Sequence, residues 1–273
     1  MKLIVKLVLL SFVVFQAACS AETVTTKGGG GTPSSNSGSK VSSVAAPVDL
    51  ATVKANAQAV FTNINPQYKI LSTTESGIAG FYRVQVEKGP TIYMNADASY
   101  FFTGDAFMVE SGNLVNLSEK AMNAERFTVM SSLKESEMVV FDVKPPMTRK
   151  AQVTIFTDVD CYYCQKMHLE VPALNEMGIA VRYMAFPRAG VGSASYNKIV
   201  SAWCADDPQT TMTMLKSKQT VANKTCKNPV ADQYKLGQQL GVTGTPAILL
   251  DDGSLIPGYR PANKLAASLG IQP

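Results

Sequence analysis

Two cysteines three positions apart, Cys161 and Cys164, are the residues best placed in this sequence for covalent chemistry, with Tyr162 and Tyr163 between them. Residues 153–157, just before them, are apolar and predict a buried strand. If a helix begins at Cys161, free N–H groups and the helix dipole favour its thiolate. Cys164 then lies one turn further on the same face. The spacing therefore predicts thiol–disulfide exchange, with Cys161 as the nucleophile and Cys164 as the resolving thiol.

Two other interpretations of this pair stay open, a structural disulfide and half of a zinc site. A zinc site needs two more good ligands, and the only histidine, His168, lies four residues after Cys164 on the same helical face. No fourth ligand is evident, so we expect neither a metal nor another cofactor. His168 itself either tunes the thiolate or packs in the interior.

A second signal is the glycine-rich turn at residues 241–247, which contains Thr245 and Pro246. A proline at the start of a buried strand is poorly placed unless the chain bends there. The Thr245–Pro246 bond is therefore a candidate cis peptide. In a thioredoxin fold this bond abuts the cysteine motif, where the backbone of Thr245 can pair with an extended substrate. The alternative is an ordinary turn proline.

The remaining cysteines indicate an oxidising compartment. The chain has five, and setting Cys19 aside leaves an even number. Cys204 and Cys226 are too far apart for a redox motif or a compact metal site, so we expect them to form a structural disulfide.

The N-terminus is typical of an export signal, predicted over residues 1–18. Lys2 and Lys6 precede an apolar run that is too short to span a bilayer comfortably. Cys19 follows small residues, as in the lipobox of bacterial lipoproteins, and a Gly/Ser-rich tether is predicted over residues 19–48. We expect a lipid on Cys19. The alternatives are cleavage just after Cys19 and an uncleaved N-terminal membrane anchor.

Composition narrows the function further. The chain of 273 residues is 46% hydrophobic and 17% charged, which excludes disorder and a bundle of membrane helices. The formal net charge is +4, and Lys2 and Lys6 account for two of these charges. The remainder is too small to indicate nucleic-acid binding.

Three regions follow the tether. Residues 49–115 predict a small α+β domain, with a helix and then short strands separated by turns. Residues 116–136 contain good helix formers without Gly or Pro, so they predict a linker helix. Residues 137–273 alternate strands and helices. The predicted helices include 161–177, most of 194–240 and 261–269, and the predicted strands include 138–143, 153–157, 181–186, 246–250 and 254–256. A Cys-x-x-Cys that follows a buried strand and opens a helix predicts an α/β fold with a thioredoxin-like domain.

With these motifs in hand, the chain resembles the DsbC/DsbG family of periplasmic protein-disulfide isomerases, closer to its DsbC members. The resemblance covers about residues 49–271. It is carried by residues 156–168 (Phe-Thr-Asp-Val-Asp-Cys-Tyr-Tyr-Cys-Gln-Lys-Met-His), by Trp203-Cys204-Ala205 with Cys226, by residues 236–247, and by Pro257-Gly258-Tyr259.

The resemblance implies a homodimer joined through the N-terminal domains, with two thioredoxin domains facing a cleft. It also implies a periplasmic location, mis-disulfided exported proteins as clients, and a membrane electron donor of the DsbD type that keeps Cys161 and Cys164 reduced. The Tyr-Tyr dipeptide and the Gly/Ser-rich tether depart from the family pattern. Two other functions stay open, a dithiol oxidase of the DsbA kind and a non-enzymatic holdase chaperone.

Overall fold

The structure, a computed structural model, describes residues 48–272 except Lys88. The predicted signal peptide, almost all of the tether and the lipidation candidate Cys19 lie outside the described residues. Within the part that is described, no helix combines the length and apolar character that a bilayer crossing needs.

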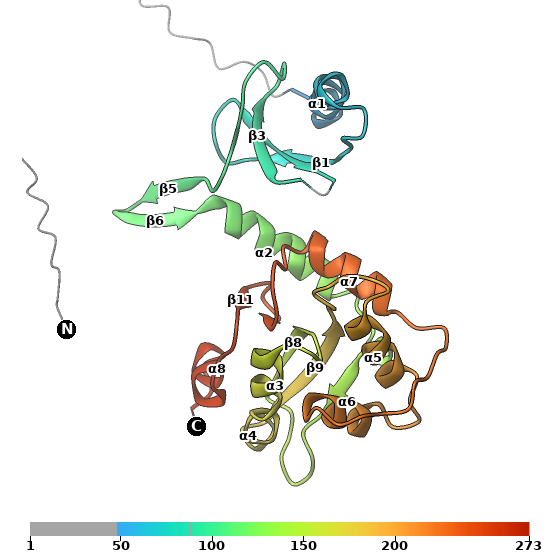
Figure 1. Ribbon diagram of the computed structural model, residues 1–273. Helices are drawn as coiled ribbons and strands as arrows, with labels where there is room; N and C mark the ends of the chain where they lie inside the picture. Colours follow the sequence, from blue (N-terminus) through green and yellow to red (C-terminus); the bar gives the residue numbers. More distant parts are fainter. Residues whose placement is uncertain (1–47, 88, 273) are drawn as a thin grey trace, which may run out of the picture. The chain divides into compact units, whose positions relative to one another are not determined.

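The N-terminal domain packs one helix on an antiparallel sheet (Figure 1). Helix α1 (Leu50–Ile64) places Val53, Ala57 and Phe61 on one face, and these three side chains are buried. The helix packs on strands β1 and β2 because apolar side chains of the sheet cover the same face. The sheet order is β1-β2-β3-β4, with β1 (Ile70–Glu75), β2 (Phe81–Val86), β3 (Thr91–Asn95) and β4 (Phe101–Thr103).

A second, two-stranded sheet was not predicted from the sequence. Strands β5 (Phe107–Glu110) and β6 (Asn113–Asn116) form a hairpin whose central turn residues, Ser111 and Gly112, both have positive φ angles. That backbone suits a tight hairpin turn, although Ser-Gly is a weaker sequence signal for it than Asn-Gly. The strands are also largely exposed, so their sequences lack the alternation of a half-buried strand.

The predicted linker helix is present as α2 (Leu117–Met130). It begins where the sequence indicated, since the side chain of Asn116 accepts a hydrogen bond from the backbone N–H of Glu119 at 2.9 Å. A short 3-10 turn, η1 (Glu135–Glu137), then leads into the C-terminal domain.

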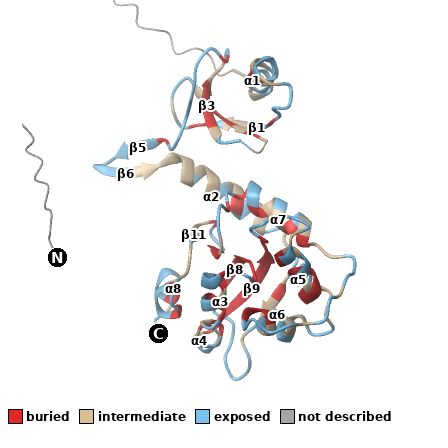
Figure 2. Cartoon of the chain, in the orientation of Figure 1, coloured by how far each residue is buried: buried red, intermediate tan, exposed pale blue. Residues whose placement is uncertain are grey.

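The C-terminal domain is built on a five-stranded sheet with the order β11-β10-β8-β9-β7. The two central strands, β8 and β9, are parallel, and the other neighbours are antiparallel. Every residue of β9 is buried, and the centre of this sheet is the most buried part of the domain in Figure 2. The strands are β7 (Val139–Phe141), β8 (Ala151–Thr157), β9 (Ile179–Ala185), β10 (Ala247–Leu249) and β11 (Leu255–Pro257).

Helices cover both sides of this sheet, as Figure 1 shows. Helix α4 packs on β9 and α8, α7 packs on β9, and α6 packs on α3, α5 and β7. The helices are α3 (Tyr162–His168), α4 (Val171–Glu176), α5 (Ala194–Trp203), α6 (Pro208–Lys216), α7 (Val230–Gln239) and α8 (Ala262–Ser268).

The prediction of one continuous helix over residues 161–177 is wrong. Helix α3 ends at His168, and α4 begins at Val171. The cause is Pro172, which has no N–H to donate and whose ring would clash with the carbonyl of His168 in a continuous helix. The stretch over residues 194–240, which was expected to be mostly helical, contains three helices, with an irregular segment between α6 and α7.

A disulfide holds that irregular segment. Cys204, at the end of α5, is bonded to Cys226 with an S–S distance of 2.04 Å, and the two residues are 22 positions apart. The backbone N–H of Lys224 also donates to the hydroxyl of Ser201 at 3.2 Å. Both links attach the segment to α5.

We predict that Cys204→Ser with Cys226→Ser destabilises the fold without removing its chemistry. Opening a loop of this length costs about 3 kcal/mol in the chain-entropy account of disulfides. Denaturant unfolding measures the loss, with the oxidised parent protein as reference. Activity of the folded variant should be largely kept, and loss of activity at unchanged stability would show that this pair takes part in the reaction.

Candidate functional site

The two cysteines of the motif follow the central strand β8 directly. The backbone N–H of Cys161 donates to the carbonyl of Asp158 at 3.3 Å, which closes the turn after the strand. Cys161 is the N-cap residue of α3, and its carbonyl accepts the first helical hydrogen bond, from Gln165 at 3.0 Å. The end of the buried strand therefore determines where the helix starts, and the start of the helix determines the position of the Cys161 sulfur.

Both cysteines carry free thiols, and their surroundings differ. Cys161 retains 2% of its surface exposed, and Cys164 retains none. The thiol of Cys161 donates to the carbonyl oxygen of Thr245 at 3.2 Å, and the sulfur of Cys164 accepts from the backbone N–H of Asp158 at 3.5 Å. Only Cys161 therefore presents any surface to an incoming disulfide.

The same surroundings move the two thiol pKa values in opposite directions. The hydrogen bond from Cys164, followed by that from Thr245 and by the charge of Arg188, lowers the pKa of Cys161 to about 5 against the opposing effect of burial. Burial raises the pKa of Cys164 well above its ordinary value. Cys161 is thus the thiolate at neutral pH, and Cys164 is its hydrogen-bond donor.

Thr245 and Pro246 lie against the motif, and the bond between them is cis, which confirms that expectation. Thr245 contributes the carbonyl that accepts from Cys161. Its hydroxyl is buried and, among the described residues, has no hydrogen-bond partner. Once Cys161 ionises, that hydroxyl is a donor available to the thiolate.

Asp158 organises the turn, and the motif-based analysis did not single it out. One carboxylate oxygen accepts from the backbone N–H of Asp160 at 2.9 Å and from the hydroxyl of Ser195 at 2.7 Å. The other accepts from the backbone N–H of Arg188 at 2.8 Å. This buried side chain therefore joins three segments of the chain around the thiols. Its only sequence signal is an acidic residue directly after a buried strand.

Lys216 is a second residue that sequence reasoning missed. It is 4% exposed and donates from Nζ to the hydroxyl of Thr157 at 2.5 Å and to the carbonyl of Asp158 at 2.9 Å. A signal was present, because Lys216 shares the buried face of α6 with Met212 and Leu215, where an apolar residue is expected.

His168 lies in the interior and does not reach the thiols. Its Nδ1 is 3.0 Å from the hydroxyl of Tyr183, and its Nε2 is 3.0 Å from the hydroxyl of Thr213. Burial and the charge of Lys216 lower the pKa of His168 to about 4, so the ring is neutral. This placement fits the packing alternative for His168. Within the described residues, no group of three or more His, Cys, Asp and Glu side chains is placed to hold a metal.

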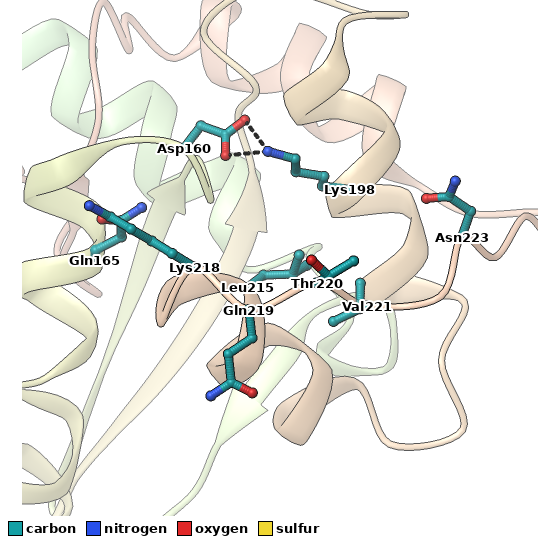
Figure 3. A pocket seen from close by; sticks show the side chains of 9 residues that line it. All are labelled: Asp160, Gln165, Lys198, Leu215, Lys218, Gln219, Thr220, Val221 and Asn223. Atoms are coloured by element: carbon teal, nitrogen blue, oxygen red, sulfur yellow. Dashed lines mark hydrogen bonds and ion pairs between the residues drawn. The ribbon is translucent and has the colours of Figure 1, made fainter.

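The outer surface of the motif is aromatic on one side and charged on another. Tyr162 and Tyr163 are 67% and 56% exposed, and their rings meet edge to face at 5.3 Å between centroids. A pocket of about 440 Å³ borders the motif, since Asp160 and Gln165 line it (Figure 3). At its rim Lys198 and Asp160 form an ion pair at 2.8 Å.

Known protein families match two parts of the chain. Residues 44–119 match the disulfide bond isomerase protein N-terminal domain, and residues 145–271 match a thioredoxin-like domain. The chain is also 36% identical over 188 residues to the thiol:disulfide interchange protein DsbC of Escherichia coli K12, covering 69% of this chain and 76% of that protein. The chain belongs to the DsbC family. The resemblance inferred from the motifs is thereby confirmed, as is the thioredoxin-like fold.

A second DsbC protein and one solved structure are also similar to this chain. The thiol:disulfide interchange protein DsbC of Pasteurella multocida is 33% identical over 217 residues, which cover 75% of this chain and 91% of that protein. A crystal structure of a disulfide interchange protein from Neisseria gonorrhoeae has 26% identity and a TM-score of 0.45, covering 50% of this chain and 96% of its own.

We predict that Cys161 ionises with a midpoint near pH 5 in the reduced protein. Thiolate absorbance and the rate of alkylation should rise through that pH and level off above it. Cys164→Ala removes the largest cause of the lowered pKa, so it should move the midpoint towards the ordinary thiol value of about 8.5. Cys164→Ser keeps a hydroxyl donor and should move it less. A midpoint near 8.5 in the parent protein would contradict the assignment.

Proposed function

We propose that this protein reduces and isomerises incorrect disulfides in exported proteins, with Cys161 as the nucleophile and Cys164 as the resolving thiol. The observation that carries the proposal is the contrast between the two free thiols. Cys161 has some exposed surface and a lowered pKa, whereas Cys164 is fully buried and has a raised pKa. The attacking species is a thiolate, so this contrast orders the two steps.

In the first step the thiolate of Cys161 attacks one sulfur of a client disulfide. A bond forms between that sulfur and Sγ of Cys161, the client's S–S bond breaks, and its other sulfur leaves as a thiolate. The client can then rearrange, since its free thiolate attacks a different disulfide and the last exchange expels Cys161. The protein ends this route as it began, with no net oxidation.

The second route is reduction. Cys164 loses its proton and attacks Sγ of Cys161, so the bond between the two cysteines forms and the bond to the client breaks. The client sulfur leaves as a thiolate and takes up a proton. The two cysteines have lost two electrons and the client disulfide has gained them, so an external dithiol must restore the pair.

The location and the electron donor are inferences from the sequence and from the family resemblance. We propose that the chain acts in the periplasm, that a lipid on Cys19 attaches it to the membrane, and that a DsbD-type membrane protein re-reduces its dithiol. The predicted export signal and the disulfide between Cys204 and Cys226 support an oxidising compartment outside the cytoplasm.

We also propose that the N-terminal domain joins two copies of this chain. Strand β4 is an edge of its sheet, and edge strands with free backbone groups invite pairing. Large apolar side chains are exposed on β4 and on the hairpin next to it, more than an isolated small domain is expected to leave in water. They are Phe101, Phe102, Phe107, Val109 and Leu114.

The catalytic roles predict that Cys164→Ala accumulates clients bonded to Cys161. The mixed disulfide still forms, but no thiol within the motif can resolve it. Non-reducing electrophoresis of purified variant incubated with a scrambled multi-disulfide protein should show these adducts, and Cys161→Ala is the matched control that should show none. Adducts of equal amount on Cys161→Ala would assign the nucleophile to another residue.

The dimer proposal predicts that charges on the hairpin separate the two copies. Val109 and Leu114 are cross-strand partners, 72% and 70% exposed. Val109→Asp with Leu114→Asp should leave the fold intact and lower the sedimentation mass from two chains to one. Leu169→Asp, an equally exposed apolar position on the catalytic domain at 76%, should stay dimeric. A parent protein that sediments as a monomer would defeat the proposal.

A further inference from the structure

Lys216 places an ammonium group next to the cysteine motif, and no carboxylate of the described residues forms an ion pair with it. Its two acceptors, the hydroxyl of Thr157 and the carbonyl of Asp158, are neutral. No ion pair of the described residues includes Lys216. An isolated buried ammonium is costly, and burial lowers the pKa of Lys216 accordingly. A function that needs the charge would explain why the position is not apolar.

The acidic side chains nearest to Lys216 are already engaged elsewhere. The carboxylate of Asp158 accepts from Ser195 and from the backbone of Arg188, and that of Asp160 pairs with Lys198. Neither carboxylate therefore forms an ion pair with the ammonium, although the charges of both favour its protonated form.

The titratable groups on the other elements that face Lys216 are uncharged. His168 of α3 is neutral because its pKa is lowered, and burial raises the pKa of Tyr183 of β9, whose ring centroid is 5.6 Å from Nζ. The charges that favour an ionised Lys216 are those of Cys164, Asp158, Cys161 and Asp160, and that of Cys164 is the largest of them.

One residue connects the ammonium to the resolving sulfur. The carbonyl of Asp158 accepts from Nζ of Lys216 at 2.9 Å, and the backbone N–H of Asp158 donates to Sγ of Cys164 at 3.5 Å. The charge of Lys216 also opposes the burial that raises the pKa of Cys164. Negative charge at Cys164 thus lies within the field of Lys216, in a site where water does not screen it.

We propose that Lys216 is a positioning residue that stabilises negative charge on Cys164 during resolution of the mixed disulfide. This inference rests on the proposed function. In the step concerned, Cys164 loses its proton, its thiolate bonds to Sγ of Cys161, and the client sulfur leaves with the electron pair of the broken bond. The proton released by Cys164 is balanced by the one that the client thiolate takes up. Lys216 keeps its own proton throughout.

The test is single-turnover kinetics of the reduced full-length protein with glutathione disulfide, followed by acid quench and mass spectrometry. The first glutathione leaves when Cys161 attacks, and the second leaves when Cys164 resolves the adduct. Lys216→Met keeps the side-chain volume and removes the charge. We expect it to slow release of the second glutathione about tenfold at neutral pH, and to move the pH profile of that step about one unit upward. The first step should change less than about twofold, because the pKa of Cys161, about 5, can rise by one unit and still leave this thiol mostly ionised at neutral pH.

Two further variants separate charge from other effects. Lys218→Met removes a neighbouring exposed lysine and should behave as the parent protein in both steps. Lys216→Gln keeps a hydrogen-bond donor without the charge, so it should slow the second step as Lys216→Met does, and it replaces that variant if the methionine protein does not fold.

The outcomes distinguish this inference from the proposed function. A parental second step in Lys216→Met or Lys216→Gln would overturn the role of Lys216 while leaving the function in place. Equal slowing of both steps would also overturn it, by showing a general structural role. Failure of the parent protein to form any adduct on Cys161 would overturn the proposed function, and the role of Lys216 with it.

Discussion

The hydrogen bonds of Asp158 are the constraint on which the site depends. Its carboxylate accepts from Asp160, Ser195 and Arg188, its backbone N–H donates to Cys164, and its carbonyl accepts from Cys161 and Lys216. Every polar atom of this buried residue is used. The end of β8, the start of α3, the loop after β9 and the end of α6 are held together at one point. A buried carboxylate with several donors is satisfied only while all of these segments stay in place.

That arrangement gives two chemically similar thiols different properties. The sulfur of Cys161 accepts hydrogen bonds as a thiolate and keeps a small exposed surface. Cys164 is fully buried, and its thiol is one of the donors to Cys161. In the proposed mechanism the thiolate of Cys161 attacks first, and the protonated thiol of Cys164 resolves the adduct more slowly. A slower second step gives a client time to rearrange, as the proposed isomerase function requires. Lys216 has the opposite effect to burial at Cys164. Burial disfavours the thiolate of Cys164, and the charge of Lys216 stabilises it.

Much of this was predictable from local sequence patterns. The spacing of Cys161 and Cys164 after an apolar strand located the helix start, and the glycine-rich turn before Pro246 indicated the cis bond. The prediction of a single helix over residues 161–177 was wrong. It followed the helical periodicity of the segment and gave too little weight to Pro172, which interrupts the helix. The hairpin of β5 and β6 was missed because exposed strands carry no alternating pattern.

The roles of Asp158 and Lys216 needed the fold. Lys216 is far from the motif in sequence, and only the packing of α6 against α3 brings its ammonium to the backbone of Asp158. Asp158 looks like an ordinary polar residue at the end of a strand until its partners from three other segments are known. Sequence patterns report local periodicity well, but they do not report which distant donors meet one carboxylate.

The central claim is that Cys161 and Cys164 act from the reduced state, as a dithiol that attacks client disulfides, and their redox state in living cells tests it most directly. Cells are quenched with acid, free thiols are alkylated, and peptides that contain each cysteine are compared by mass spectrometry. The account predicts that Cys161 and Cys164 are mainly alkylated, while the disulfide of Cys204 and Cys226 in the same sample is not. Cys161 and Cys164 recovered mainly as a disulfide would contradict it and would indicate a dithiol oxidase instead.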